Sequence, residues 1–459
     1  MPSHRDAEPA VTAPTPPSAT ELVNFFRSAA KPRAAWRIGI EQEKIAVLPD
    51  GRPVPYEASP GTPGTRGTIL QILQLLVGRG FSPQMEDGHI IALERGAERI
   101  TVEPGGQLEL SGAAQASASA CRDALLAHVA EVSAVARPLG VRFLGCGARP
   151  FGNLDDIPWL PKRRYTVMRS YLPTRGRLAL EMMKRTATVQ ANLDFADEPD
   201  GLEKIRAALG VTSIVTALFA ASPITDGKPN GYKSYRAAIW LETDEDRCGL
   251  LPFAFKPGFA FSDYAEWALD VPMFFVVRDG VYRPAGQGLT FRRFLREGFA
   301  GERATLADWE LHLSTVFPEV RLKRTIEVRG ADAAALPFAV GLGALWRGLL
   351  DDVEARAQAW KLVADRTMSE RETLRREVPR AGLAARFGGR SLRDLAVEVC
   401  KIAAAGVRRL PDGADDARLI EPLLAYAEAG RCPADDLLDD FKATGGDPAK
   451  LIDRWELRA

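Results

Sequence analysis

Histidine and cysteine are scarce in this sequence: its 459 residues include four histidines and five cysteines. They form no CxxC pair, no Cys/His cluster and no HExxH or HxxxH spacing, so we expect no zinc site. The chain also lacks a GxxxxGKS or GxxxxGKT phosphate-binding loop and a GxSxG nucleophile elbow. These absences argue against a P-loop nucleotidase and against a serine hydrolase of the elbow type.

A net charge is also missing, because sixty basic residues balance sixty acidic ones. Such a chain has no bulk field that would favour nucleic acid or an anionic membrane. No apolar run approaches the roughly 18–20 residues of a membrane span. The five cysteines are widely spread and follow no secretory leader, so we expect a reducing, cytoplasmic location. We expect small-molecule partners, no nucleic acid, no membrane, and a monomer or a homodimer.

The order of elements predicts one large domain behind a short tail. Residues 1–20 are too poor in apolar side chains to pack, so we expect a disordered tail. Residues 21–459 show no repeat and no long linker, and we expect a single catalytic domain, mostly helical from about residue 338. Strand-like segments with one polar face are scattered among helical patterns. This arrangement predicts an α+β fold with a mainly antiparallel sheet.

Residues 99–112 are the most informative stretch. They combine a short strand, a Pro-Gly-Gly break and a second extended run, and they place Glu103 and Glu109 on either side of the break. Gly105 and Gly106 permit backbone angles and close approaches that side chains forbid. A strand seldom carries acids in this way for stability alone, so we ask what these two carboxylates hold.

Four strand-like segments share this property of acids or amides on one face. Because strand side chains alternate, residues two apart point the same way. The segments carry Glu41 with Glu43, Glu103 with Glu109, Gln190 with Asn192 and Asp194, and Glu327 with Arg329. Any one of these faces could be a solvated outer surface. The joint pattern favours a single cavity that they line together.

Five glutamates in one cavity would repel one another, and divalent cations and arginines are the usual remedy. Hard oxygen ligands suit Mg²⁺, and also Mn²⁺. The pattern therefore predicts a metal–nucleotide site with phosphoryl transfer as its chemistry. Two alternatives stay open: a non-catalytic metal- or nucleotide-binding protein, and an RNA binder that uses the basic segment 162–169, which is equally typical of a solvated loop.

Ordered motifs along most of the chain resemble the plant and proteobacterial glutamate–cysteine ligases. The matching segments are Gly39-Ile-Glu-Gln-Glu-Lys44, Glu103-Pro-Gly-Gly-Gln-Leu-Glu-Leu-Ser-Gly112, Asp156-Ile-Pro158, Met182-Met-Lys-Arg-Thr-Ala-Thr-Val-Gln-Ala-Asn-Leu-Asp-Phe195, Gly227-Lys-Pro-Asn-Gly231, Asp246-Arg247, Ala268-Leu-Asp-Val-Pro-Met273 and Phe317-Pro-Glu-Val-Arg-Leu-Lys-Arg324 with Glu327-Val-Arg-Gly-Ala-Asp332. The resemblance implies a glutamine-synthetase-like fold, in which a curved antiparallel sheet forms a funnel and the helices pack outside.

The resemblance also implies a reaction, the first step of glutathione synthesis. Glutamate's γ-carboxylate would take the γ-phosphoryl group of ATP, and the amine of cysteine would attack the acyl phosphate. Positioning and charge neutralisation suffice for this chemistry, so no protein nucleophile is needed.

Motif positions then assign roles to individual residues. Arg329 would lie on the transferring phosphate, and Arg247 would contact phosphate or substrate. Thr188 and Arg236 would orient glutamate. The residues that would hold Mg²⁺ are Glu41, Glu43, Glu103, Glu109, Gln190 and Glu327.

Two departures from the family pattern concern the amine. Trp267 and Phe274 stand where the family has tyrosines, close to the Ala-Leu-Asp-Val-Pro-Met run. If these side chains contact substrate, the loss of a hydroxyl would change the choice of amine. A γ-glutamyl ligase for a different amine acceptor is therefore the nearest alternative function.

Overall fold

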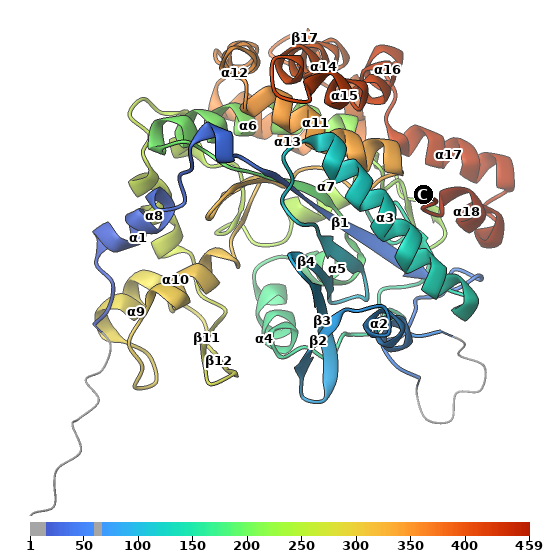
Figure 1. The fold of residues 1–459 in the computed structure, drawn as a ribbon, viewed down its shortest axis with the longest axis horizontal. Helices are drawn as coiled ribbons and strands as arrows, with labels where there is room; N and C mark the ends of the chain where they lie inside the picture. The colour runs from blue at the N-terminus through green and yellow to red at the C-terminus, as the bar shows by residue number, and fades with distance from the viewer. Residues whose placement is uncertain (1–14, 59–66) are drawn as a thin grey trace, which may run out of the picture.

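An antiparallel sheet runs through the centre of the protein (Figure 1). The computed structural model describes residues 15–58 and 67–459, so residues 1–14 of the predicted tail lie outside it. Within the described residues the sheet has nine strands, in the order β14 (Val320–Leu322), β15 (Ile326–Val328), β7 (Val189–Leu193), β1 (Ile38–Val47), β5 (Leu108–Ser111), β4 (Glu98–Val102), β3 (His89–Arg95) and β2 (Ser82–Glu86), with β6 (Arg142–Leu144) also paired to β1. The prediction of an α+β fold with a mainly antiparallel sheet is confirmed.

Strand β1 explains why the sheet has two different faces. Its burial alternates along the first part of the strand: Ile38 and Ile40 are buried, whereas Glu41 and Glu43 are partly exposed. The apolar side chains face the helices, and the acids face the opposite side of the sheet. β1 pairs with β5, β6 and β7, so it holds the two halves of the sheet together.

Helices cover the apolar face in two layers. The inner layer consists of α3 (Ala118–Ala136), α6 (Glu198–Leu218) and α11 (Leu336–Leu350). Most of α6 and α11 is buried, as expected for helices that are apolar nearly all round. A second layer packs on them in Figure 1, formed by α12 (Val353–Lys361), α14 (Leu392–Arg408), α15 (Gly413–Arg418) and α16 (Glu421–Ala429). Helix α13 (Met368–Ala381) packs against α6.

The helical C-terminal part begins close to the predicted position. α11 starts at Leu336, and helices follow to the end of the chain, interrupted by the short pair β16 (Arg386–Phe387) and β17 (Arg390–Ser391). α17 (Pro433–Thr444) and α18 (Pro448–Trp455) complete this part. That residues 21–459 form one catalytic domain stays a prediction.

Shorter elements surround the polar face of the sheet. They are α4 (Arg163–Tyr171), α5 (Ala179–Arg185), α7 (Tyr235–Leu241) and the pairs β10 (Cys248–Gly249) with β13 (Phe317–Pro318) and β11 (Phe275–Arg278) with β12 (Val281–Pro284). Further helices lie towards the edges of the sheet: α1 (Ala19–Arg27), α2 (Ile69–Val77), α8 (Phe261–Asp270), α9 (Phe291–Glu297) and α10 (Leu306–Leu313). Searched over the described residues, no helix has the length and apolar character needed to cross a membrane.

The two helix layers meet in direct backbone contact. A Cβ built at Gly348 of α11 would lie 2.1 Å from the carbonyl oxygen of Ala403 in α14. A Cβ at Gly406 would in turn lie 2.2 Å from the carbonyl oxygen of Gly348. The two helices therefore approach as closely as they do because both positions lack a side chain.

We expect Gly348→Ala to push α11 and α14 apart and to lower the free energy of unfolding by about 1–3 kcal/mol, as overpacking does. Ala is the better helix former, so propensity alone would stabilise the variant by up to about 1 kcal/mol. Urea denaturation followed by circular dichroism separates the two effects by their sign. A variant as stable as the wild type or more so would show that the close approach is not required.

Candidate active site

A cavity of about 400 Å³ opens on the polar face of the sheet. Strands β1, β4, β5, β7, β13 and β14 and helices α4, α5 and α7 surround it, together with Arg329 just after β15. Six of the residues predicted from the sequence to form the site line it. They are Glu41, Glu43, Glu103, Glu109, Gln190 and Arg329.

Cross-strand register places the acids side by side. Glu43 of β1 is directly opposite Glu109 of β5, and Glu41 is opposite Gln190 of β7. Opposite residues on one face of a sheet have Cβ atoms only about 4.5–5.5 Å apart. The strands therefore build one acidic wall.

The Pro-Gly-Gly break brings Glu103 to this wall as well. A Cβ at Gly105 would lie 2.1 Å from the carbonyl oxygen of Lys184, so the turn packs directly on the end of α5. Gly106 has a φ of +81°, which favours glycine. The Tyr165 hydroxyl of α4 donates to Glu103 Oε1 at 3.2 Å. These contacts place Glu103 and Glu109 on the same cavity in spite of the break between them.

The acidic wall is poorly neutralised. Burial, and then the charges of Glu327 and Glu109, raise the pKa of Glu41 to about 7. Burial and the charge of Glu103 raise the pKa of Glu109 to about 7. Burial and the charges of Glu109 and Glu103 raise the pKa of Glu43 well above its ordinary value. These carboxylates are destabilised by desolvation and by one another.

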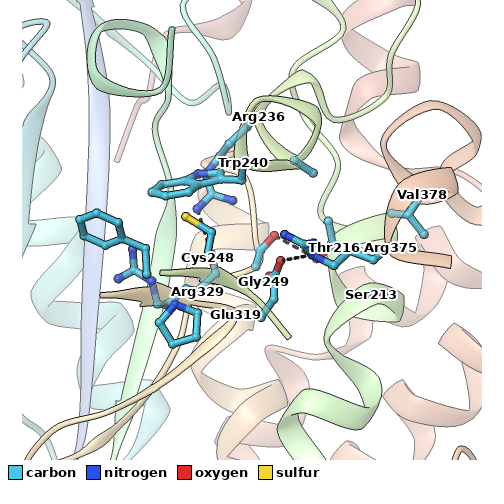
Figure 2. Close-up of a pocket in the computed structure, with 14 residues that line it drawn as sticks. Ser213, Thr216, Arg236, Trp240, Cys248, Gly249, Glu319, Arg329, Arg375 and Val378 are labelled. Atoms are coloured by element: carbon cyan, nitrogen blue, oxygen red, sulfur yellow. Dashed lines mark hydrogen bonds and ion pairs between the residues drawn. The ribbon is translucent and has the colours of Figure 1, made fainter. Parts of the chain in front are cut away.

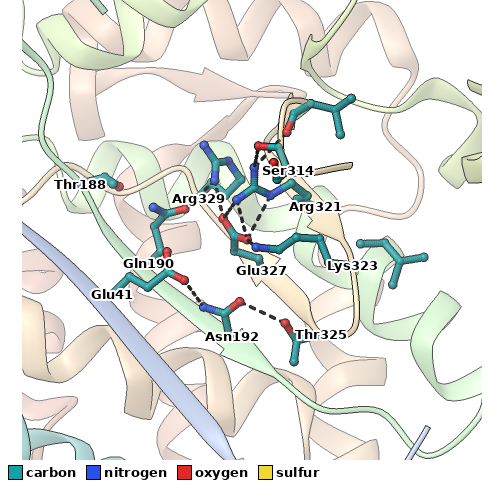
Figure 3. Close-up of polar contacts among 12 residues, drawn as sticks. Glu41, Thr188, Gln190, Asn192, Ser314, Arg321, Lys323, Thr325, Glu327 and Arg329 are labelled. Carbon is teal, nitrogen blue, oxygen red and sulfur yellow. Dashed lines mark hydrogen bonds and ion pairs between the residues drawn. The ribbon is translucent and has the colours of Figure 1, made fainter. Parts of the chain in front are cut away.

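A basic wall lies beside the acids, where Arg321, Lys323 and Arg329 gather around Glu327 (Figure 3). Arg321 binds Glu327 through Nε and Nη2, at 3.0 Å and 2.7 Å, and Lys323 Nζ lies 2.7 Å from the same carboxylate. Arg329 also donates to Glu327, and to Gln190 Oε1 at 2.8 Å. Burial raises the pKa of Glu327, but the three cations outweigh it and hold that pKa well below the ordinary value. Glu327 thus differs from the other acids in being fully paired.

A small inner chamber of about 30 Å³ adjoins the cavity (Figure 2). Trp240, Phe317 and Arg329 line both spaces. Arg236 of α7 lines the chamber, and its Nη2 donates to the carbonyl oxygen of Arg329 at 2.9 Å. Arg236, predicted to orient glutamate, is therefore beside the cavity and linked to the strand that carries Arg329.

Arg247 lines neither the cavity nor the inner chamber, although the resemblance implies that it contacts phosphate or substrate. Its side chain is fully buried, with Nε 2.7 Å from Asp244. Its two terminal nitrogens donate to the carbonyl oxygens of Thr315 and Pro272. The geometry gives Arg247 a structural role in place of the predicted contact, because its donors are used inside the fold.

The predicted amine-contacting aromatics are also packing residues. Phe274 is 2% exposed and lies 3.9 Å from the Arg247 guanidinium. Trp267 packs against Phe253 and Tyr264. Neither side chain lines the cavity, so their contact with the amine stays a prediction.

Thr188 does not line the cavity either. Its hydroxyl donates to the carbonyl oxygen of Ala331 at 2.7 Å, and its backbone N–H donates to Glu43 Oε2 at 3.0 Å. Instead of touching glutamate directly, Thr188 fixes the orientation of Glu43.

Sequence reasoning missed most of the cations of the site. Arg321 and Lys323 are two apart at strand β14, so the alternation used for the acids could have found them. Lys162 and Arg164 line the cavity from the start of α4, within the basic segment considered for RNA. Two of the four cations of that segment therefore line an acidic cavity, whereas Arg163 and Arg169 are exposed.

The donor set fits a divalent cation in its chemistry. In residues 15–58 and 67–459 no three His, Cys, Asp or Glu side chains already converge on one point as metal ligands. However, Glu41, Glu43 and Glu109 supply hard oxygen donors whose mutual repulsion a cation would relieve. Glu327 would have to exchange a cationic partner before it could join them.

We expect Glu109→Gln to stabilise the protein in the presence of a chelator. Since folding raises the pKa of Glu109 from 4.5 to about 7, ionising it costs the native state more than the unfolded one. The wild type therefore loses stability relative to the variant as pH rises from 4.5 through 7, by up to about 3 kcal/mol. Urea denaturation at pH 5 and pH 8 measures this difference. A gap that does not widen with pH would contradict the electrostatic account.

Curated relatives carry one common name. A chloroplastic glutamate–cysteine ligase of Brassica juncea is 41% identical over 443 residues, which cover 96% of this chain and 84% of that protein. The chloroplastic glutamate–cysteine ligase of Medicago truncatula is 42% identical over 440 residues, covering 94% and 84%.

These names correct one prediction. The expected cytoplasmic location is wrong, because the similar curated proteins are chloroplastic. The five cysteines are free, as expected for a reducing environment. Free thiols report how reducing a compartment is, and they do not distinguish one reducing compartment from another.

The fold has a solved counterpart in the glutamate–cysteine ligase of Francisella tularensis in complex with AMP. The TM-score is 0.53 at 13% identity, over 92% of this chain and 87% of that one, so this likeness supports the fold alone. The sequence model of glutamate–cysteine ligase family 2 matches residues 37–453. With this match and relatives above 40% identity over nearly its whole length, the chain belongs to the glutamate–cysteine ligase family.

Proposed function

We propose that this cavity joins the γ-carboxylate of L-glutamate to the amine of L-cysteine at the expense of ATP, the first step of glutathione synthesis. One observation carries the proposal: an acidic wall and a basic wall line a single cavity. A triphosphate and an amino acid together bring anionic groups, a cationic amine and metal counter-ions. The basic wall suits the anionic groups, and the acidic wall suits the cations. Membership of a ligase family argues against a non-catalytic binding protein.

The basic wall would bind the transferring phosphoryl group. Arg329, Arg321 and Lys323 reach the cavity from neighbouring strand positions, and Glu327 holds their charged ends together. Preorganised cations stabilise developing negative charge without reorganising during the reaction. None of the described lining residues is a histidine or a cysteine, which fits a reaction that proceeds through a γ-glutamyl phosphate without a protein nucleophile.

The acidic wall would hold Mg²⁺, or Mn²⁺ in its place. Glu41, Glu43, Glu103, Glu109 and Gln190 supply the oxygen donors. When bound, the metal neutralises phosphate charge and orients the γ-phosphoryl group. The chain's own part is to keep these oxygens in place: Asn192 Nδ2 donates to Glu41 Oε1 at 3.0 Å, which fixes one end of the wall.

Glutamate would lie between the walls, near the inner chamber. Arg236 carries its charge there, and its pKa is lowered by burial although Asp332 and Glu43 oppose this. A buried arginine gains from an incoming carboxylate, because the ion pair offsets the cost of desolvation. Among the described parts of the chain, α13 supplies Arg375 to this chamber, so we treat residues 21–459 as one catalytic unit.

We expect cysteine to stimulate phosphate release from ATP and glutamate more than any other amine. The measurement is phosphate release by the full chain with glutamate, ATP, Mg²⁺ and a panel of amino acids and simple amines. The neutral, sulfur-free analogues alanine and serine are the matched controls for cysteine. Selective stimulation by another amine would reassign the chain as a γ-glutamyl ligase for that acceptor.

We expect Glu103→Gln to abolish turnover and to weaken Mg²⁺ binding while the fold stays intact. The amide keeps the shape and can still accept from the Tyr165 hydroxyl, but it removes one charge from the metal-binding wall. Steady-state kinetics, calorimetry with Mg²⁺–ATP and circular dichroism measure the three effects. Glu297→Gln, which alters an exposed pair with Arg293, is the control and should leave activity unchanged. Full activity of Glu103→Gln would refute the assigned site.

A further inference from the structure

A buried ion pair joins helix α13 to the inner chamber (Figure 2). Arg375 of α13 donates through Nε to Glu319 Oε1 at 3.0 Å, and both side chains are largely buried. Glu319 lies between β13 and β14, where the chain turns towards the basic wall. Arg375 comes from the C-terminal helical part, so the pair connects segments that are 56 residues apart.

Two glycines leave room for this pair. Gly249 has a φ of +99°, and a Cβ there would lie 3.2 Å from the guanidinium carbon of Arg375. A Cβ at Gly330 would lie 3.3 Å from Glu319 Oε2, and closer still to the hydroxyl of Thr216. Side chains at these positions would displace the guanidinium from one side and the carboxylate from the other. The local backbone is therefore shaped around the ion pair.

Hydrogen bonds connect the backbone of Glu319 to Arg329 and, through Arg329, to Arg236. The backbone N–H of Arg329 donates to the Glu319 carbonyl oxygen at 3.1 Å. The carbonyl oxygen of Arg329 accepts from Arg236 Nη2 at 2.9 Å. The N–H of Glu319 donates to the Gly249 carbonyl oxygen at 2.9 Å, which anchors the other side. A shift of Glu319 would thus move the Arg329 backbone, and the Arg236 side chain with it.

We propose that Glu319 and Arg375 form a positioning pair, which fixes Arg236 for glutamate through the backbone of Arg329 and thereby makes helix α13 part of the substrate site. This inference rests on the proposed function of the cavity. It goes beyond that function because neither residue lines the main cavity. The pair acts through the peptide of Arg329.

When a buried, charge-assisted ion pair loses one partner, the neighbouring groups have to rearrange, because the remaining charge is poorly solvated. Arg375 has a second carboxylate, Glu372, 3.5 Å from its Nη1, so removing Glu319 does not leave Arg375 unpaired. Removing Arg375 does take away the cationic partner of Glu319, so the Glu319 carboxylate must find water or a new partner. Glu319 can do so only by leaving its place against Gly330. The expected consequence is a less ordered Arg236, which lowers the affinity for glutamate.

The experiment compares Arg375→Met, Arg375→Lys, Glu319→Gln and the double variant Glu319→Gln/Arg375→Met in the full chain. We expect the KM for glutamate to rise roughly tenfold in Arg375→Met, the size of one lost charged hydrogen bond, while the KM for ATP changes less than about twofold. Arg375→Lys should recover most of the loss. The double variant should be no worse than the poorer single one, because the two residues act as one unit.

Arg409→Met is the matched control, since Arg409 forms an ion pair with Asp352 away from the chamber. If Arg375 had a purely structural role, Arg375→Met would lower the melting temperature and kcat of the protein as the control does, and it would leave the KM for glutamate unchanged. That result would overturn the proposal. Additive effects of Glu319→Gln and Arg375→Met would overturn it too.

Calorimetry with glutamate and a non-hydrolysable ATP analogue gives a readout without turnover. Tight binding by the wild type without ligation would refute the proposed function alone, and equal affinity in Arg375→Met would refute the positioning pair alone.

Discussion

The constraint on which this structure depends is the crowding of several partly buried carboxylates beside one another. Glu41, Glu43 and Glu109 lie in one wall, and their raised pKa values express the energy stored there. A fold that only had to be stable would place apolar or paired side chains at these positions, because unpaired buried charge is costly. The wall is therefore intelligible as a binding surface whose missing counter-charge arrives with the ligands.

The two faces of the sheet have separate roles: one forms the core, and the other carries the charged groups. The apolar face of the sheet is covered by α6 and α11 and by a second helical layer, and it supplies most of the core. The polar face is left to carry charge, with the cations gathered around Glu327 on one side of the acids. Glu327 has the opposite condition from its neighbours: it is paired in the free protein, and it keeps three cations close together before any phosphate is present.

The periodicity of the sequence was enough to identify the acids of the site, but it did not predict which residues contact one another across strands. Alternation in single strands identified Glu41, Glu43 and Glu109, because a period of two fixes the face of a side chain locally. Register across strands, such as Glu43 opposite Glu109, is a long-range property. Arg247 shows the limit of arguing from motif position: its motif predicted a ligand contact, whereas carbonyl oxygens far along the chain take up its donors.

The same distinction explains why the C-terminal helices could be predicted as elements but not as part of the site. Their apolar patterns give length and position along the chain, and α11 begins two residues before the expected boundary. What they contribute to the cavity depends on one polar side chain, Arg375, whose partner Glu319 lies 56 residues away. No local pattern marks that pairing. Glycines offer the only trace of it, since Gly249 and Gly330 are needed where a guanidinium and a carboxylate must fit against the backbone. A packed sheet supplies the walls of such a site, and tertiary contacts between distant polar residues decide how sharply its arginines are held.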